Sequence, residues 1–179
     1  MSWATPLFTP AMKTDANRIC LALLALFVAG CASQPPRPMA AWSLDDNKPY
    51  MQPGTGGITG QAFSRTQGGD VKFAAGCPIY LFPATAYYMD WTQRALYARG
   101  HVAPLANYAV HCIRQTVADG GGNFTFSGLP AGNYIVYTEL FWKIPYVLPS
   151  GSVVGETTGG PIAGTVSVSD GQTIQFVLN

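Results

Sequence analysis

Charged residues and histidines are scarce in this sequence. Of its 179 residues only 11% are charged, two are histidines, and the formal net charge is +1. A charge balance so close to zero argues against a nucleic-acid partner. His101 and His111 lie outside any HExxH pattern and have no paired cysteines nearby, so we expect no metal site.

The motifs of common enzyme classes are also missing. Ser152 lies in SGSVVG, which lacks the GxSxG elbow of serine hydrolases, and the glycines at 120–122 are not followed by the Lys-Ser/Thr pair of a phosphate-binding loop. Asp119 and Asp170 fall in predicted turns, where local hydrogen bonding accounts for an aspartate. We therefore predict a protein that is not an enzyme and that has no cofactor.

Long hydrophobic segments are absent, apart from one short run near the amino terminus. Lys13 and Arg18 precede the apolar residues Ile19 to Ala29. As a helix this run would span roughly 16 Å, about half of a ~30 Å hydrocarbon core. It is therefore typical of a secretory signal rather than of a transmembrane helix. Met1 and Met12 both remain possible starts, and MKTDANR after Met12 is the more typical beginning of a signal peptide.

The apolar run ends in Val28-Ala29-Gly30-Cys31, which closely resembles the lipobox of bacterial lipoprotein signal peptides. The resemblance implies cleavage before Cys31, lipidation of Cys31 and attachment to a membrane through this lipid anchor. In that family an Asp just after the cysteine usually retains the protein at the inner membrane, whereas Ala32 and Ser33 follow here. The resemblance therefore implies the cell envelope, at the bacterial outer membrane, facing either the periplasm or the surface.

The composition divides the chain into three parts. Residues 1–30 are the expected signal peptide, and residues 31–56 are rich in proline and glycine, which is typical of a tether. Trp42 and Leu44 within the tether either pack on the domain or stay free of it. Residues 57–179 form the expected single domain.

Alternating apolar residues and glycine turns predict an all-β domain from residue 57 onward. Phe124 and Phe126 share one strand face between two turns, which predicts a β-meander over 118–137. Asp170-Gly171 predicts a second hairpin. The spacing within 84–100 predicts a short helix, whereas prolines in 141–149 and glycines in 151–160 predict a long loop and a flexible segment.

The stretch 116–137 is similar to the signature of carboxypeptidase regulatory-like domains, in which a glycine turn precedes Phe-x-Phe and Leu-Pro-x-Gly-x-Tyr. The strands ITGQAF and PIYLFP and the final SVSDGQTIQFVL match the same pattern. The resemblance implies a seven-stranded prealbumin-like, or transthyretin-like, β-sandwich of the Ig-like kind. The helical insertion after Pro83 and the aromatic segment after Leu140 depart from that pattern.

Two cysteines remain if Cys20 leaves with the signal peptide and Cys31 is acylated. An exported protein meets an oxidising compartment, so we expect Cys77 and Cys112 to form a disulfide. The rival interpretation is a free nucleophilic cysteine paired with His111. Neighbours in a strand point to opposite faces, which disfavours a dyad of Cys112 with His111.

Aromatic residues in the two departures from the family pattern are the candidate binding face. They are Tyr87, Tyr88, Trp91, Tyr97, Phe141, Trp142 and Tyr146. Such side chains pack into a core, anchor a protein interface or stack on sugar rings, and the accessibility of the two tryptophans separates the first from the others. We expect a non-catalytic structural or protein-interaction role in the envelope. The alternatives are a polysaccharide-binding module and a transthyretin-like lipoprotein of a secretion assembly.

Overall fold

A computed structural model describes residues 37–179, and the expected signal peptide and Cys31 lie outside them. Met39–Asn179 form one compact unit. No helix in the described part of the chain has both the length and the apolar character needed to cross a membrane.

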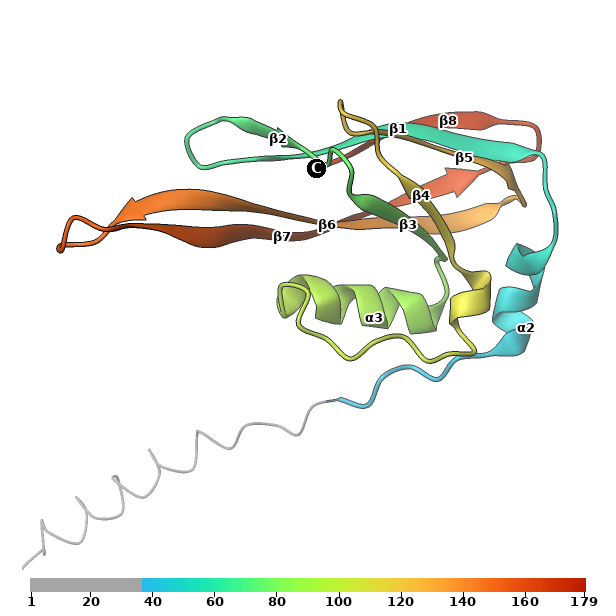
Figure 1. Cartoon of the computed structure of the whole chain (residues 1–179). Coiled ribbons are helices and arrows are strands. Elements are labelled where there is room, and N and C mark those ends of the chain that lie inside the picture. Colours follow the sequence, from blue (N-terminus) through green and yellow to red (C-terminus); the bar gives the residue numbers. More distant parts are fainter. Residues whose placement is uncertain (1–36) are drawn as a thin grey trace, which may run out of the picture. The chain divides into compact units, whose positions relative to one another are not determined.

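Two four-stranded sheets face each other and form a β-sandwich (Figure 1). In the first sheet β1 (Gly56–Arg65) pairs antiparallel with β5 (Asn123–Leu129) and β2 (Val71–Phe73), and parallel with β8 (Thr173–Leu178). The second sheet has the order β4 (Arg114–Val117), β3 (Pro78–Pro83), β6 (Gly132–Val147) and β7 (Val153–Val168). The all-β sandwich is confirmed, with eight strands in the described residues where seven were expected.

Turns that were expected to close hairpins instead carry the chain from one sheet to the other. β5 pairs with β1 and β6 pairs with β3, so the predicted meander over 118–137 is wrong. Likewise β7 pairs with β6 and β8 pairs with β1, so Asp170-Gly171 does not close a hairpin. A turn sequence sets where the chain reverses, whereas the strand that it then joins depends on which sheet has a free edge.

The segment expected to be loop and flexible linker is a long β-ribbon. β6 and β7 pair without a break from Gly132 opposite Val168 to Val147 opposite Val153. Beyond Thr138 the only strand among the described residues that pairs with β6 is β7, so no described strand pairs with the outer edge of either one. A proline at such an edge costs no ladder hydrogen bond, which is why Pro145 and Pro161 are compatible with the ribbon.

Helix α3 (Ala86–Tyr97) confirms the predicted helix and covers the face of the second sheet that points away from the first (Figure 1). The second sheet therefore has two buried faces. Its inner face and the first sheet enclose the inner core, which includes Ile58, Ile79, Leu81, Phe124, Phe126, Leu129, Tyr134, Val136, Leu140 and Leu178. Its outer face and the helix enclose the outer cluster, which is Phe82, Tyr87, Tyr88, Ala95, Ala109, Cys112, Ile135 and Tyr137.

The second half of the expected tether packs on the sandwich. It contains the short helix α2 (Leu44–Asn47) and the 3-10 turn η2 (Lys48–Met51). The ring centroids of Trp42 and Tyr108 are 5.3 Å apart. Asn47 is fully buried, whereas Leu44 is 54% exposed. Trp42 therefore packs on the domain and Leu44 does not.

The predicted disulfide between Cys77 and Cys112 is absent, and both thiols are free. Cys77 precedes β3 and packs against the inner core. Cys112 lies in the 3-10 turn η3 (Val110–Cys112) and belongs to the outer cluster. The two side chains thus lie on opposite faces of the second sheet. Burial raises the pKa of each thiol, which leaves both as weakly reactive neutral groups.

Candidate functional site

The seven predicted aromatic residues are divided among three settings. Tyr87 and Tyr88 lie on the buried side of α3, in the outer cluster. Trp91 and Trp142 are half-buried, and each lines a different cavity. The remaining three, which are Tyr97, Phe141 and Tyr146, are exposed. The structure therefore gives the two tryptophans separate surroundings rather than one shared face.

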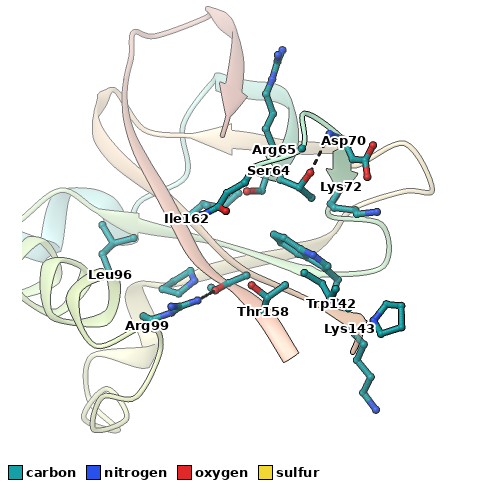
Figure 2. Close-up of a pocket in the computed structure, with 18 residues that line it drawn as sticks. Ser64, Arg65, Asp70, Lys72, Leu96, Arg99, Trp142, Lys143, Thr158 and Ile162 are labelled. Carbon is teal, nitrogen blue, oxygen red and sulfur yellow. Dashed lines mark hydrogen bonds between the residues drawn. The ribbon is translucent and has the colours of Figure 1, made fainter. Parts of the chain in front are cut away.

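Trp142 lines an open cleft of about 780 Å³, which we call the ribbon cleft (Figure 2). Three segments far apart in the sequence form it: the hairpin of β1 and β2, the β6–β7 ribbon, and the end of α3. Its lining includes Ser64, Arg65, Asp70, Lys72, Leu96, Arg99, Trp142, Lys143, Thr158, Gly159 and Ile162. The cleft thus combines one aromatic ring with hydroxyl and charged groups.

The position of Trp142 depends on a glycine in the facing strand. Gly159 has φ of 98°, a left-handed conformation that other residues rarely adopt. A Cβ at this position would lie 2.2 Å from the carbonyl oxygen of Leu140 and 2.8 Å from Cζ3 of the indole. The indole therefore lies directly against backbone, and its Nε1 is buried without a hydrogen-bond partner among the described residues.

Arg99 connects the end of α3 to the same glycine. It has φ of 52° and Gly100 has φ of 86°, and the N–H of Gly100 donates to the carbonyl of Ala95. This left-handed ending stops the helix and turns the chain toward the ribbon. Nη2 of Arg99 then donates to the carbonyl oxygen of Gly159 at 2.8 Å. One edge of the cleft is therefore fixed by a charge-assisted hydrogen bond.

The charged groups of the ribbon cleft are mostly basic. Arg65, Lys72, Arg99 and Lys143 line it, against the single carboxylate of Asp70. The Asp70 backbone N–H donates to Oγ1 of Thr66 at 3.1 Å within the hairpin loop. Glycosidases of the usual kind need two carboxyl groups across the scissile bond. The chemistry of this lining favours binding over acid–base catalysis.

Trp91 lines a smaller cavity of about 350 Å³, which we call the aromatic pocket. Buried Phe82 and Tyr137 also line it, and their ring centroids are 5.8 Å apart. The Trp91 ring lies edge-on to Tyr137 at 5.4 Å, and its Nε1 donates to the carbonyl of Ala103 at 2.9 Å. Tyr80 also lines the pocket.

The polar group of the aromatic pocket is a carboxylate. The Tyr137 hydroxyl donates to Oε1 of Glu139 at 2.7 Å, and Glu139 lines the pocket. Burial, together with this hydrogen bond, raises the pKa of Tyr137 above its usual value. The aromatic rings that line the pocket mainly contact one another, so their chief role is to pack α3 against the sheet.

Sequence reasoning identified Trp142 and missed the other residues of the ribbon cleft. Arg65 and Lys72 flank a polar turn, and Arg99 follows the predicted helix, so each looks like an ordinary surface residue. Only the pairing of β6 with β7 brings Lys143 and Thr158 beside them. No signal in the linear sequence joins these segments.

The fold has a close match among solved structures. A proposed carbohydrate-binding protein from Pseudomonas aeruginosa matches with a TM-score of 0.63 and 24% identity, over 79% of this chain and 99% of that one. At this level of identity the match shows a shared fold. No protein-family model and no curated protein matches the sequence.

Two pilins are more distant matches. The minor pilin of Streptococcus agalactiae has a TM-score of 0.36 and 14% identity over 70% of this chain. The major pilin subunit of Bacillus cereus has a TM-score of 0.34 and 19% identity over 70% of this chain. The matches span only 43% and 29% of those pilins.

Proposed function

We propose that this protein is a non-catalytic carbohydrate-binding module of the cell envelope and that the ribbon cleft is its binding site. The observation that carries the proposal is Trp142 in an open cleft of about 780 Å³, beside hydroxyl and charged side chains. Sugar rings present apolar C–H faces that pack on indole, and their hydroxyl groups need hydrogen-bonding partners around that contact. The ribbon cleft supplies both.

The open form of the cleft favours a polymer over a single sugar. The β1–β2 hairpin and the β6–β7 ribbon line it on different sides, with Trp142 between them in the view of Figure 2. An open cleft gives a long glycan access to Trp142 part-way along its length. The shared fold with a proposed carbohydrate-binding protein supports the same ligand class.

The position of the protein in the cell is part of the proposal. The lipobox-like residues ending in Cys31 support a lipid anchor and hence a site on the bacterial outer membrane. The motif over 116–137 supports membership of the carboxypeptidase regulatory-like domains. An anchored module of this kind holds a polysaccharide close to the membrane. Mass spectrometry of the amino-terminal peptide of the mature protein tests the anchor. We expect its first residue to be an acylated Cys31.

Substitution of the two tryptophans tests the glycan site. We expect Trp142→Ala to weaken binding of a soluble polysaccharide at least about tenfold, because loss of an aromatic anchor costs about 2 kcal/mol or more and about 1.4 kcal/mol is a factor of ten. Trp91→Ala is the matched control and leaves affinity unchanged, since Trp91 lines the other cavity. Thr158→Val, a smaller change within the cleft, weakens binding without removing the ring. Affinity electrophoresis in gels that contain polysaccharide measures all three, and equal loss in Trp91→Ala would contradict the assignment.

A protein-binding role is the second candidate, and the exposed tip of the ribbon favours it. Uncharged residues fill 144–155, and Ile144, Tyr146, Val147, Val153 and Val154 are all exposed there. Exposed apolar patches of this kind often mark interfaces. A photo-crosslinking residue at Val147 should trap a discrete partner in cells, whereas one at exposed Tyr97 should not. Absence of an adduct at Val147 would remove this candidate.

A further inference from the structure

Basic residues are concentrated at the ribbon cleft. Residues 37–179 contain eight Lys or Arg and eight Asp or Glu, so the described chain is neutral overall. Half of those basic residues line the cleft, whereas one acidic residue, Asp70, does so. An even distribution would place as many carboxylates as cations around it. Cationic side chains therefore outnumber carboxylates at the cleft although the described chain has no excess charge.

The basic side chains surround the cleft and do not converge on one point. In Figure 2 Arg65 extends away on one side, Lys143 extends away on the opposite side, and Arg99 lies near the ribbon backbone. A compact anion such as phosphate needs several donors directed at one centre. Separated cations instead fit a ligand that carries negative charges repeatedly along its length.

Two further carboxylates lie near this region and leave the balance positive. Glu139 accepts the hydrogen bond of Tyr137 and lines the aromatic pocket. Glu156 lies opposite Ile144, further toward the tip of the ribbon, and is exposed. Neither lines the cleft beside Trp142.

We propose that the ligand of the ribbon cleft is an acidic polysaccharide, one with carboxylate or sulfate groups along its chain. This inference rests on the proposed glycan-binding function and specifies its substrate class. Trp142 supplies the contact with a sugar face, and the four surrounding cations select chains whose repeating units are charged. A neutral glycan can pack on Trp142 but has no charge to interact with the four cations.

A matched pair of polymers tests the inference. Polygalacturonate carries a carboxylate on every unit, and its fully methyl-esterified form has the same sugar backbone without the charge. We expect polygalacturonate to bind at least about tenfold more tightly. Its affinity falls as NaCl is raised from 0.1 M toward 1 M, where the screening length shrinks from about 10 Å to about 3 Å. Isothermal titration calorimetry measures both ligands.

Charge-reversed variants locate the effect. Lys72→Glu combined with Lys143→Glu should reduce the affinity for polygalacturonate at least about tenfold. It should leave the affinity for the esterified polymer unchanged. Lys48→Glu is the matched control, because Lys48 is exposed in η2 and does not line the cleft. An equal loss with Lys48→Glu would show a diffuse charge effect and would overturn the site.

The outcomes separate this inference from the function on which it rests. If both polymers bound with equal affinity and salt had no effect, the proposal of an acidic ligand would be wrong, whereas the proposed glycan site would still hold. Binding of neither polymer would overturn the proposed function and the inference with it. Polyglutamate, which has the charge without the sugar, should bind more weakly than polygalacturonate. Equal binding of polyglutamate would also overturn the glycan function.

Discussion

Both faces of the second sheet carry aromatic side chains, but these residues pack against α3 on one face and line an open cleft on the other. On the outer face, Trp91 of α3 packs on Phe82 and Tyr137 of the sheet, and a small apolar pocket remains beside them. On the inner face, the core ends at Trp142, which lines an open cleft rimmed by cations. Trp142 is thus part of a candidate site because it lies where the inner core ends and an open cleft begins. Trp91 and Trp142 are both half-buried, so exposure alone does not distinguish a binding aromatic residue from a packing one.

The largest difference between the faces should appear in stability. Phe82 is 2% exposed and contacts the rings of Tyr80, Tyr88, Trp91 and Tyr137. We expect Phe82→Ala to lower the free energy of unfolding by about 3–5 kcal/mol. Tyr97→Ala, at a side chain that is 93% exposed, should change it by less than about 0.5 kcal/mol. Urea unfolding measures both, and a loss below about 1 kcal/mol for Phe82→Ala would show that the outer cluster is loosely packed.

Gly159 should be the sensitive backbone position of the cleft. Its positive φ and the contacts of a Cβ with Leu140 and Trp142 predict that Gly159→Ala destabilises by about 1–3 kcal/mol. The variant should also weaken glycan binding, because the indole must move. Gly151→Ala is the matched control, since Gly151 has φ of 83° and nothing lies within 4 Å of its Cβ position. It should cost less and spare binding, and equal effects on affinity would contradict the role of the Trp142 contact.

Alkaline pH should destabilise both faces. Burial raises the pKa of Tyr134 in the inner core to about 12, and it raises the pKa of Tyr88 and Tyr137 in the outer cluster. In the unfolded chain these phenols ionise near pH 10. Above that pH the folded state keeps protons that the unfolded state has lost. The contribution of these phenols to the free energy of unfolding is therefore fully present below about pH 10 and decreases as pH rises toward 12.

The tyrosine variants assign that decrease to the buried phenols. Tyr134→Phe and Tyr137→Phe should each flatten the dependence of the urea midpoint on pH above 10. Tyr97→Phe should leave it unchanged, because that ring is exposed. A protein whose urea midpoint stays constant from pH 9 to 11.5 would contradict the burial of these phenols.

Reduction should have the smallest effect. A bond between Cys77 and Cys112 would close a loop that contributes roughly 3–4 kcal/mol on the chain-entropy account. Both thiols are free and lie on opposite faces of the second sheet, so dithiothreitol should leave the urea midpoint unchanged. Alkylation of the denatured, unreduced protein should modify both residues. A peptide that links Cys77 to Cys112 would contradict this separation.

The sequence predicted local structure well and pairing poorly. The spacing of Tyr87, Trp91 and Ala95 predicted α3, and the alternation of Phe124 and Phe126 predicted a strand with one buried face. Both patterns depend on residues close in the chain. The meander and the final hairpin were wrong because β5 and β8 both pair with β1, which lies far from either of them in the sequence.

The candidate site was predictable only in part. Trp142 was identified by its residue type. The ribbon was missed because the prolines in 141–149 and the glycines in 151–160 indicated a loop and a flexible segment, whereas Pro145 is compatible with a strand at a free edge. Lys72 and Arg99 became candidates only once the β1–β2 hairpin, the end of α3 and the ribbon were placed together. A charge pattern across three segments has no signature in a linear sequence.

The indole N–H resonances in a ¹⁵N-labelled sample test the central claim most directly. In the described chain Trp42 and Trp91 pack against the outer cluster, whereas Trp142 packs against the inner core. Titration with short polygalacturonate chains should shift the Trp142 resonance progressively and leave those of Trp91 and Trp42 in place. A shift confined to Trp91, or no indole shift at saturating ligand, would contradict the assignment of the ribbon cleft as the binding site.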